Sequence, residues 1–163
     1  MSTTRRVSVA HVFLKRGQEV LLSKRQNTGH DDGKYAPPAG KVDRGERADE
    51  AAIREMDEEC GITIEPADLR LIGIMQIRGE RADQDERIDF FYMAERWHGE
   101  PINREPDKCA ELRWCRIDRL PVETTGPAKQ AWSRFSESGY GQNAAELWFD
   151  TFGYGEGSLE NQD

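Results

Sequence analysis

The chain has 163 residues and carries 23 lysines and arginines against 31 aspartates and glutamates, which gives a formal net charge of −8. This length suits one domain, and the periodic apolar runs within 36% hydrophobic residues argue against a disordered chain. The acidic balance gives no general attraction to nucleic acid or anionic lipid, which excludes a sequence-independent phosphate binder. An anionic substrate therefore needs a local feature that overcomes this repulsion.

Cysteine usage and hydropathy indicate the compartment. The three cysteines form no CxxC pair, so neither a disulfide framework nor a zinc ribbon is predicted. The stretch from Val7 to Leu14 is too short and too polar for a signal peptide, and no segment approaches the roughly 18 apolar residues of a membrane span. We expect a soluble, cytoplasmic protein that does not contact a membrane.

The first part of the chain predicts a hairpin, a loop and a helix. Residues 7–14 and 19–22 have the alternation of two antiparallel strands. Residues 26–38 are dense in Gly, Pro, Asn and Asp, which predicts a long loop without regular structure, often a functional feature. Apolar residues at helical spacing then predict a helix over 47–60, ended by Gly61.

The second part predicts three strands and a helix. Residues 69–77 and 88–94 are rich in β-branched and aromatic residues and are joined by an acidic turn at 79–86, so both are predicted strands. Residues 111–116 form a short strand candidate. Pro127 opens a helix whose apolar residues recur at helical spacing, because proline is favoured at the first helical position.

The pattern weakens after Tyr140, and the end of the chain is rich in glycine and acidic residues. We predict one domain over residues 1–150, on which Trp148 and Phe149 dock, and a flexible C-terminal tail over residues 151–163. Strands before and after a first helix, followed by a terminal helix, predict a mixed α/β (α+β) fold built on one sheet.

The acidity is concentrated in one segment. Residues 43–59 contain eight acidic and three basic residues, a net charge of −5. Within it, Glu55, Glu58 and Glu59 are spaced i, i+3 and i+4, so their carboxylates project from one side of the predicted helix. A solvated helix face is the ordinary explanation of such a charge run. The alternative is a Mg²⁺ site, because several alanines border the same face and uncompensated charge beside a packed surface is costly.

These residues also resemble a family signature. The segment from Gly40 to Ile62, GKVDRGERADEAAIREMDEECGI, fits the Nudix box of the Nudix (MutT-like) hydrolases. Every fixed position of the box is filled, by Gly40, Glu46, Arg54, Glu55, Met56, Glu58, Glu59, Gly61 and Ile62. Nine such matches would arise by chance in a chain of this length with a probability on the order of 10⁻⁷.

The resemblance implies a Nudix fold, an α/β/α sandwich around a mixed sheet in which the box forms a loop, a helix and a second loop. It implies that Glu55, Glu58 and Glu59 bind Mg²⁺, for which Mn²⁺ is a substitute. The main-chain carbonyl of Ala39 is a further metal ligand by the same resemblance. Family members often have Pro-Gly-Gly where this chain has Pro-Ala-Gly, and alanine keeps the carbonyl.

The resemblance also implies catalytic roles for Glu55, Glu58 and Arg54. Glu55 is comparable to the general base of some members, whereas in others the base lies outside the box. Arg54 resembles the arginine that orients a box glutamate. Glu111 is comparable to an additional glutamate that binds metal or takes part in catalysis, with an ordinary surface strand residue as the alternative. Structural support of the loop and helix is expected from Glu46 and Gly61.

Three residues are expected to bind substrate. Arg25 ends the second strand, where related enzymes often present a basic group to phosphate, although a charged strand end is also common. Tyr35 is one of several aromatics that suit stacking on a nucleobase, with core packing as the alternative. Gly40, at the box entrance, completes the set.

The implied function is Mg²⁺-dependent hydrolysis of a diphosphate linkage, by attack of water at phosphorus, in a nucleoside diphosphate linked to another moiety. About 39 residues precede the box, which favours a small substrate such as a nucleoside triphosphate or a nucleotide sugar. One alternative is a non-catalytic Nudix module that binds a nucleotide in regulation. Another is isopentenyl diphosphate isomerase, whose catalytic cysteine has no clear counterpart here. The oligomeric state, a homodimer included, is left open by the sequence.

Overall fold

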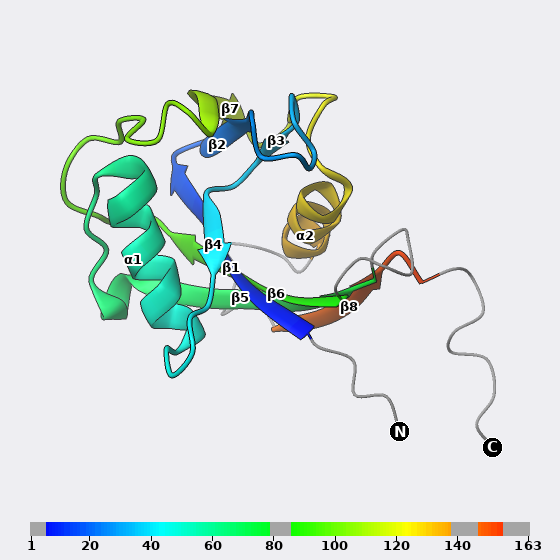
Figure 1. Cartoon of the computed structure of the whole chain (residues 1–163). Helices are drawn as coiled ribbons and strands as arrows, with labels where there is room; N and C mark the ends of the chain where they lie inside the picture. The colour runs from blue at the N-terminus through cyan, green and yellow to red at the C-terminus, as the bar shows by residue number, and fades with distance from the viewer. Residues whose placement is uncertain (1–5, 79–85, 138–146, 155–163) are drawn as a thin grey trace, which may run out of the picture.

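The computed structural model describes residues 6–78, 86–137 and 147–154. These residues form a mixed sheet with one helix on each face, α1 (Ala48–Cys60) and α2 (Gly126–Glu137), as Figure 1 shows. The α/β/α layering agrees with the predicted fold class. Neither helix has the length and apolar content that a bilayer span requires within these residues.

The sheet has eight strands in the order β3-β2-β1-β6-β5-β8, with β4 paired to β1 and β7 paired to β2. Their bounds are β1 Arg6–Arg16, β2 Glu19–Arg25, β3 Tyr35–Ala36, β4 Ala39–Lys41, β5 Leu69–Ile77, β6 Glu86–Ala94, β7 Cys109–Arg116 and β8 Trp148–Phe152, and a 3-10 turn at Pro66–Asp68 leads into β5. β1 runs parallel to β6 and antiparallel to β2 and β4. The central strand β1 therefore joins β2 and β4 to β6 and the rest of the sheet.

The two faces of the sheet bury separate cores. Along β1, Ala10, Val12 and Leu14 pack toward α1, while Phe13 packs toward α2. Alternation of side chains along a strand places these neighbours on opposite faces. The odd-numbered residues near the start of β1 consequently lie on the face that α1 does not cover.

Helix α1 begins and ends as its sequence indicates. The Glu50 side chain accepts a hydrogen bond of 2.9 Å from the backbone N–H of Arg47, the N-cap residue. Gly61 ends the helix with φ at +66°, a conformation that glycine adopts without strain. Four small or apolar residues of α1 are buried against the sheet, namely Ala51, Ala52, Met56 and Cys60. Glu55, Glu58 and Glu59 are therefore not part of this buried face.

The predicted hairpin, both helices and the strands of the middle of the chain are confirmed. The expectation that residues 26–38 lack regular structure is wrong at one point, because Tyr35–Ala36 pair with β2. The predicted domain boundary at residue 150 falls inside β8, which pairs with β5 in parallel. Residues 155–163 of the predicted tail and residues 79–85 of the predicted turn lie outside the described residues.

Candidate functional site

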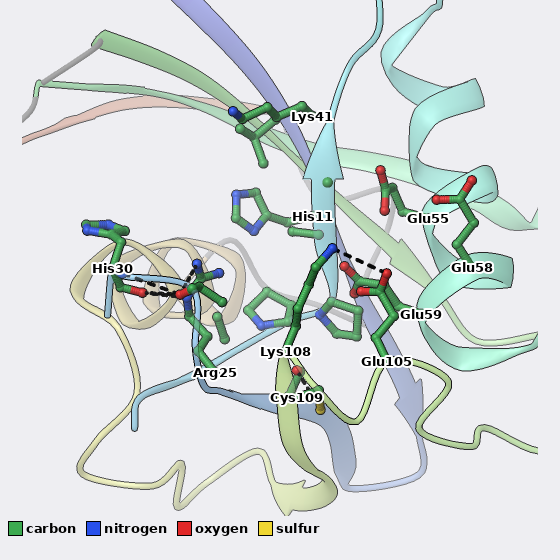
Figure 2. A pocket seen from close by; sticks show the side chains of 18 of the residues that line it. His11, Arg25, His30, Lys41, Glu55, Glu58, Glu59, Glu105, Lys108 and Cys109 are labelled. Atoms are coloured by element: carbon green, nitrogen blue, oxygen red, sulfur yellow. Dashed lines mark hydrogen bonds and ion pairs between the residues drawn. The ribbon is translucent and has the colours of Figure 1, made fainter. Parts of the chain in front are cut away.

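The site is a cavity of about 860 Å³ that opens beside the N-terminal half of β1. One end is formed by Glu55, Glu58 and Glu59 from α1 and by Glu105 from the loop before β7, which Figure 2 shows gathered together. Basic side chains from separate elements line the cavity too: Lys108 lies beside Glu105 at the acidic end, and Arg25, Lys41 and Arg87 lie elsewhere along the walls. The three helix glutamates all line this one cavity, as their spacing predicts.

Gly40 allows Glu55 to lie against β4. A Cβ atom built at residue 40 would stand 1.9 Å from Cδ of Glu55 and 2.0 Å from its Oε1. No larger residue fits without displacing the carboxylate. The glycine that the sequence suggested for substrate binding lines the cavity, and its clearest physical role is this close approach.

Arg54 links the box carboxylates. Its Nε donates to Glu46 at 2.7 Å, and its Nη1 donates to Glu55 at 2.7 Å and to Glu58 at 3.3 Å. Its Nη2 also reaches the carbonyl of Lys41 at 3.1 Å. The hydrogen bond that Arg54 donates to Glu46 raises the pKa of Arg54, and the same contact lowers the pKa of Glu46. These contacts agree with an arginine that orients glutamates and with a supporting role for Glu46.

Negative charge at the acidic end is only partly compensated. Burial, followed by the nearby carboxylates of Glu55 and Glu105, raises the pKa of Glu59 to about 8, although a hydrogen bond from the backbone N–H of Ala39 acts in the opposite direction. Burial likewise raises the pKa of Glu55, although the contact with Arg54 acts in the opposite direction. Adjacent carboxylates with raised pKa values indicate a place where a cation would be stabilised.

Glu105 is a carboxylate of the site that the sequence did not indicate. Its position is set by the loop before β7, where the backbone N–H of Glu105 donates to Asn103 at 3.1 Å and its carbonyl accepts from Cys109 at 2.9 Å. Lys108 lies 3.7 Å from its carboxylate. The residue has no fixed spacing from the box, so only the fold brings it to α1.

The donor set fits a hard divalent cation. All the acidic side chains at this end offer oxygen, which Mg²⁺ and Mn²⁺ prefer, and Ala39 lines the same cavity. As placed, the described residues contain no group of three carboxylate, histidine or cysteine side chains converging as a finished metal site. The rotatable carboxylates, two of them held by Arg54, would therefore adjust when a cation binds.

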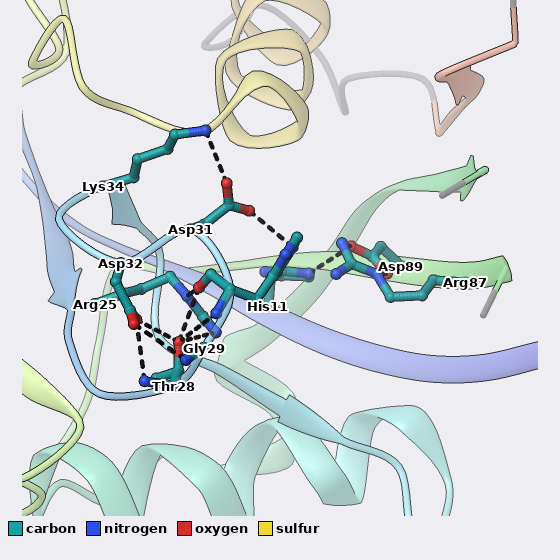
Figure 3. A network of polar contacts seen from close by, with 10 residues as sticks. His11, Arg25, Thr28, Gly29, Asp31, Asp32, Lys34, Arg87 and Asp89 are labelled. Atoms are coloured by element: carbon teal, nitrogen blue, oxygen red, sulfur yellow. Dashed lines mark hydrogen bonds and ion pairs between the residues drawn. The ribbon is translucent and has the colours of Figure 1, made fainter. Parts of the chain in front are cut away.

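Arg25 lines the cavity, but its guanidinium holds a loop. Nε donates to the carbonyl of His30 at 3.0 Å, and Nη2 donates to Oγ1 of Thr28 at 3.1 Å. The same loop is closed by Asp32, which accepts from the backbone N–H groups of Thr28 and Gly29 (Figure 3). The structure therefore supports a role for Arg25 in shaping the pocket wall.

The structure does not bring Glu111 and Tyr35 to the box. The Tyr35 hydroxyl donates a hydrogen bond to the Glu111 carboxylate, and neither residue lines the cavity. Leu112, the next residue on β7, does line it, so alternation along the strand turns Glu111 to the opposite face. Tyr35 is 4% exposed and belongs to the core on the α2 side. The geometry thus gives no support to a metal role for Glu111 or to base stacking by Tyr35.

Comparisons with known proteins identify the family to which this chain is related. The NUDIX domain family model matches residues 4–134. The 8-oxo-dGTP diphosphatase of Escherichia coli is 30% identical over 112 residues, covering 68% of this chain and 83% of that protein. The oxidized purine nucleoside triphosphate hydrolase of Mus musculus is 30% identical over 135 residues, which cover 81% of this chain and 79% of that protein.

Two further comparisons bear on size and fold. The NAD-capped RNA hydrolase NudC of Stutzerimonas stutzeri is 30% identical over 124 residues, and the match spans only 40% of that protein. The crystal structure of a MutT NUDIX hydrolase from Burkholderia pseudomallei superposes with a TM-score of 0.73 at 29% identity, covering 79% of this chain and 97% of that chain. With its complete box and the matched domain, the chain belongs to the Nudix hydrolase family.

Proposed function

We propose that this Nudix hydrolase cleaves the diphosphate linkage of a small nucleotide, in which a nucleoside diphosphate is joined to a further group, and that it requires Mg²⁺. The observation that carries the proposal is the grouping of four glutamates at one end of a cavity that basic side chains also line. The acidic end suits a metal ion, and the metal together with the basic side chains suits the phosphates that the net charge of the chain would otherwise repel.

The metal would be held by Glu55, Glu58, Glu59 and Glu105, with the main-chain carbonyl of Ala39 as the further ligand implied by the box. Mg²⁺ bound there would lower the pKa of a coordinated water and would neutralise the negative charge that develops on the leaving group. Lys41 and Lys108, which also line the cavity, would then contact the phosphate chain.

Either of two glutamates would accept the proton of the attacking water. Glu55 lies against Gly40, and Arg54 orients its carboxylate toward the cavity. Glu105 enters the same acidic end from a different element. In either case water adds to phosphorus, its proton passes to a carboxylate, and the bridging P–O bond breaks to give two phosphorylated products.

The substrate class follows from cavity size and from the relatives. A cavity of about 860 Å³ is in the range of small-molecule sites and suits one nucleotide. The relatives matched over more than two thirds of their own length are named for nucleoside triphosphate substrates. We therefore propose a nucleoside triphosphate as the first substrate to test, with nucleotide sugars next.

The test is a panel of nucleoside triphosphates, nucleotide sugars and dinucleotides, incubated with Mg²⁺, with Mn²⁺ or with EDTA, and analysed by mass spectrometry in ¹⁸O-labelled water. The proposal predicts metal-dependent cleavage and one labelled oxygen on a phosphate of the product.

Glu105→Gln should lower turnover, whereas Glu111→Gln, a matched change on the adjoining strand outside the cavity, should leave turnover unchanged. Undiminished cleavage in EDTA, or absence of cleavage across the whole panel, would overturn the proposal.

A further inference from the structure

A buried ion network forms part of the cavity at a distance from the box. Asp89 of β6 has no exposed surface, and its Oδ2 lies 2.8 Å from Nε2 of His11. Arg87 approaches the same carboxylate with Nε at 3.2 Å and Nη2 at 2.9 Å. Figure 3 shows the three side chains in line across β1 and β6. His11 and Arg87 line the cavity, whereas Asp89 lies beneath them.

The network is held by ring packing as well as by hydrogen bonds. The ring of His11 stacks on Phe91 with centroids 4.6 Å apart and planes 14° apart. Burial alone would raise the pKa of Asp89, but His11 and Arg87 outweigh it and hold that pKa below its ordinary value. The carboxylate is therefore ionised, and it fixes the Arg87 guanidinium through two nitrogens.

Fold stability alone does not explain this arrangement. Burying charge beneath a sheet is costly, and apolar residues of similar volume often serve stability as well or better. The neighbouring residues on the same face of β1, Val7 and Val9, also line the cavity and are apolar. A buried polar cluster beside apolar side chains in a cavity wall is typical of a point where a ligand is oriented.

The chemistry of the network limits what it can bind. The guanidinium of Arg87 can only donate hydrogen bonds. Its Nε and Nη2 donate to Asp89, so Nη1 is the guanidinium nitrogen that the Arg87–Asp89 pair does not use. The positive charge of Arg87 is already matched by Asp89. A neutral acceptor, such as a carbonyl oxygen, therefore suits this position better than a second anion.

We propose that Arg87, held by Asp89 and His11, donates a hydrogen bond to a carbonyl oxygen on the nucleobase, so that the pocket selects keto bases over amino bases. Hypoxanthine, guanine and uracil carry a carbonyl where adenine and cytosine carry an amino group. The amino group is itself a hydrogen-bond donor, so it could not accept the hydrogen bond that Arg87 donates. Arg87 is then a specificity residue and Asp89 a positioning residue. The inference rests on the proposed nucleotide substrate.

The test compares inosine with adenosine triphosphate, which differ at this carbonyl, and uridine with cytidine triphosphate. The wild type should favour the keto member by about 10- to 100-fold in kcat/KM. Arg87→Met should reduce this preference to less than about 3-fold, mainly through a higher KM for the keto member, as expected when binding energy is lost. Arg87→Lys keeps the charge but loses the planar fork, and it should lose most of the preference while remaining folded.

The matched control is Arg6→Met, which removes an arginine from the exposed Arg6–Glu86 pair beside the network and outside the cavity. It should leave the preference unchanged.

Equilibrium binding of inosine and adenosine monophosphates, measured by calorimetry without turnover, separates the two proposals. If no triphosphate is cleaved but inosine monophosphate binds more tightly in an Arg87-dependent way, the proposed function fails and the inference stands. Equal binding of the two monophosphates, or a keto preference that survives in both Arg87 variants, would overturn the inference.

Discussion

Gly40→Ala tests the geometry of the site with a single methyl group. The added Cβ would stand 1.9 Å from Cδ of Glu55, whereas ordinary contact begins at 3.4 Å. The carboxylate must therefore move by about 1.5 Å, because the backbone of β4 is fixed by its pairing with β1. The backbone at residue 40 is not in the left-handed region, so alanine introduces no conformational strain of its own there.

This displacement should act on rate more than on folding. A misplacement of about 1 Å at a reacting group can cost on the order of 100-fold in rate, so we expect kcat to fall by about 100-fold or more. Thermal unfolding should show a folded protein, since the displaced side chain borders an open cavity and has room to move. The assay is initial-rate hydrolysis of the best substrate of the panel, with circular dichroism as the measure of folding.

Gly73→Ala is the matched control. Its Cβ would stand 2.0 Å from the Trp148 ring, a clash of the same kind between β5 and β8, away from the cavity. It should lower the melting temperature while the folded enzyme keeps its kcat. A Gly40→Ala variant with the kcat of the wild type would refute the inference that Glu55 must lie against β4 to act.

Three other predictions concern charge. Arg54→Lys should lower kcat by about 10- to 100-fold, because lysine cannot reach Glu46 and Glu55 together, and an unchanged rate would contradict the orienting role. Asp89→Asn should destabilise the protein by roughly 2 kcal/mol at pH 7, less than a fully buried pair would lose because Arg87 is 29% exposed. The native pKa of Asp89 is lowered, so its contribution is present above its ordinary pKa and is lost as pH falls through the native value. The melting temperatures of variant and wild type should therefore converge as pH falls below about 4, and a constant gap would refute this. Mg²⁺ should raise the melting temperature, with a gain of about 2.7 kcal/mol at a concentration 100 times Kd, and Glu59→Gln should reduce the gain; no rise at saturating Mg²⁺ would count against the metal site.

The parts of the site that the sequence predicts are local. Glu55, Glu58 and Glu59 belong to one helix, so their spacing alone places them together, and the capping residues define where that helix begins and ends. Arg54 and Glu46 lie in the same segment, and their contact follows from it.

The parts that the sequence could not predict depend on long-range pairing. Glu105 reaches the box only through the course of the loop before β7. Glu111 points away from the cavity, and the sequence alone does not show which face of β7 its odd-numbered residues occupy. The network of Arg87 and Asp89 with His11 arises because β1 and β6 pair in parallel, far apart in the chain. Strand β8 is short and half-exposed, and its pairing with β5 has no local signal.

The most direct test of the central claim is the turnover of Glu55→Gln and Glu58→Gln with Mg²⁺ and the best substrate of the panel. Each change removes one negative charge while keeping the size of the side chain, so the fold should be retained. If the box carboxylates carry metal-dependent hydrolysis, kcat falls by orders of magnitude in both variants while circular dichroism remains that of the wild type. Near-normal turnover in both variants would contradict the assignment of the box as the catalytic site.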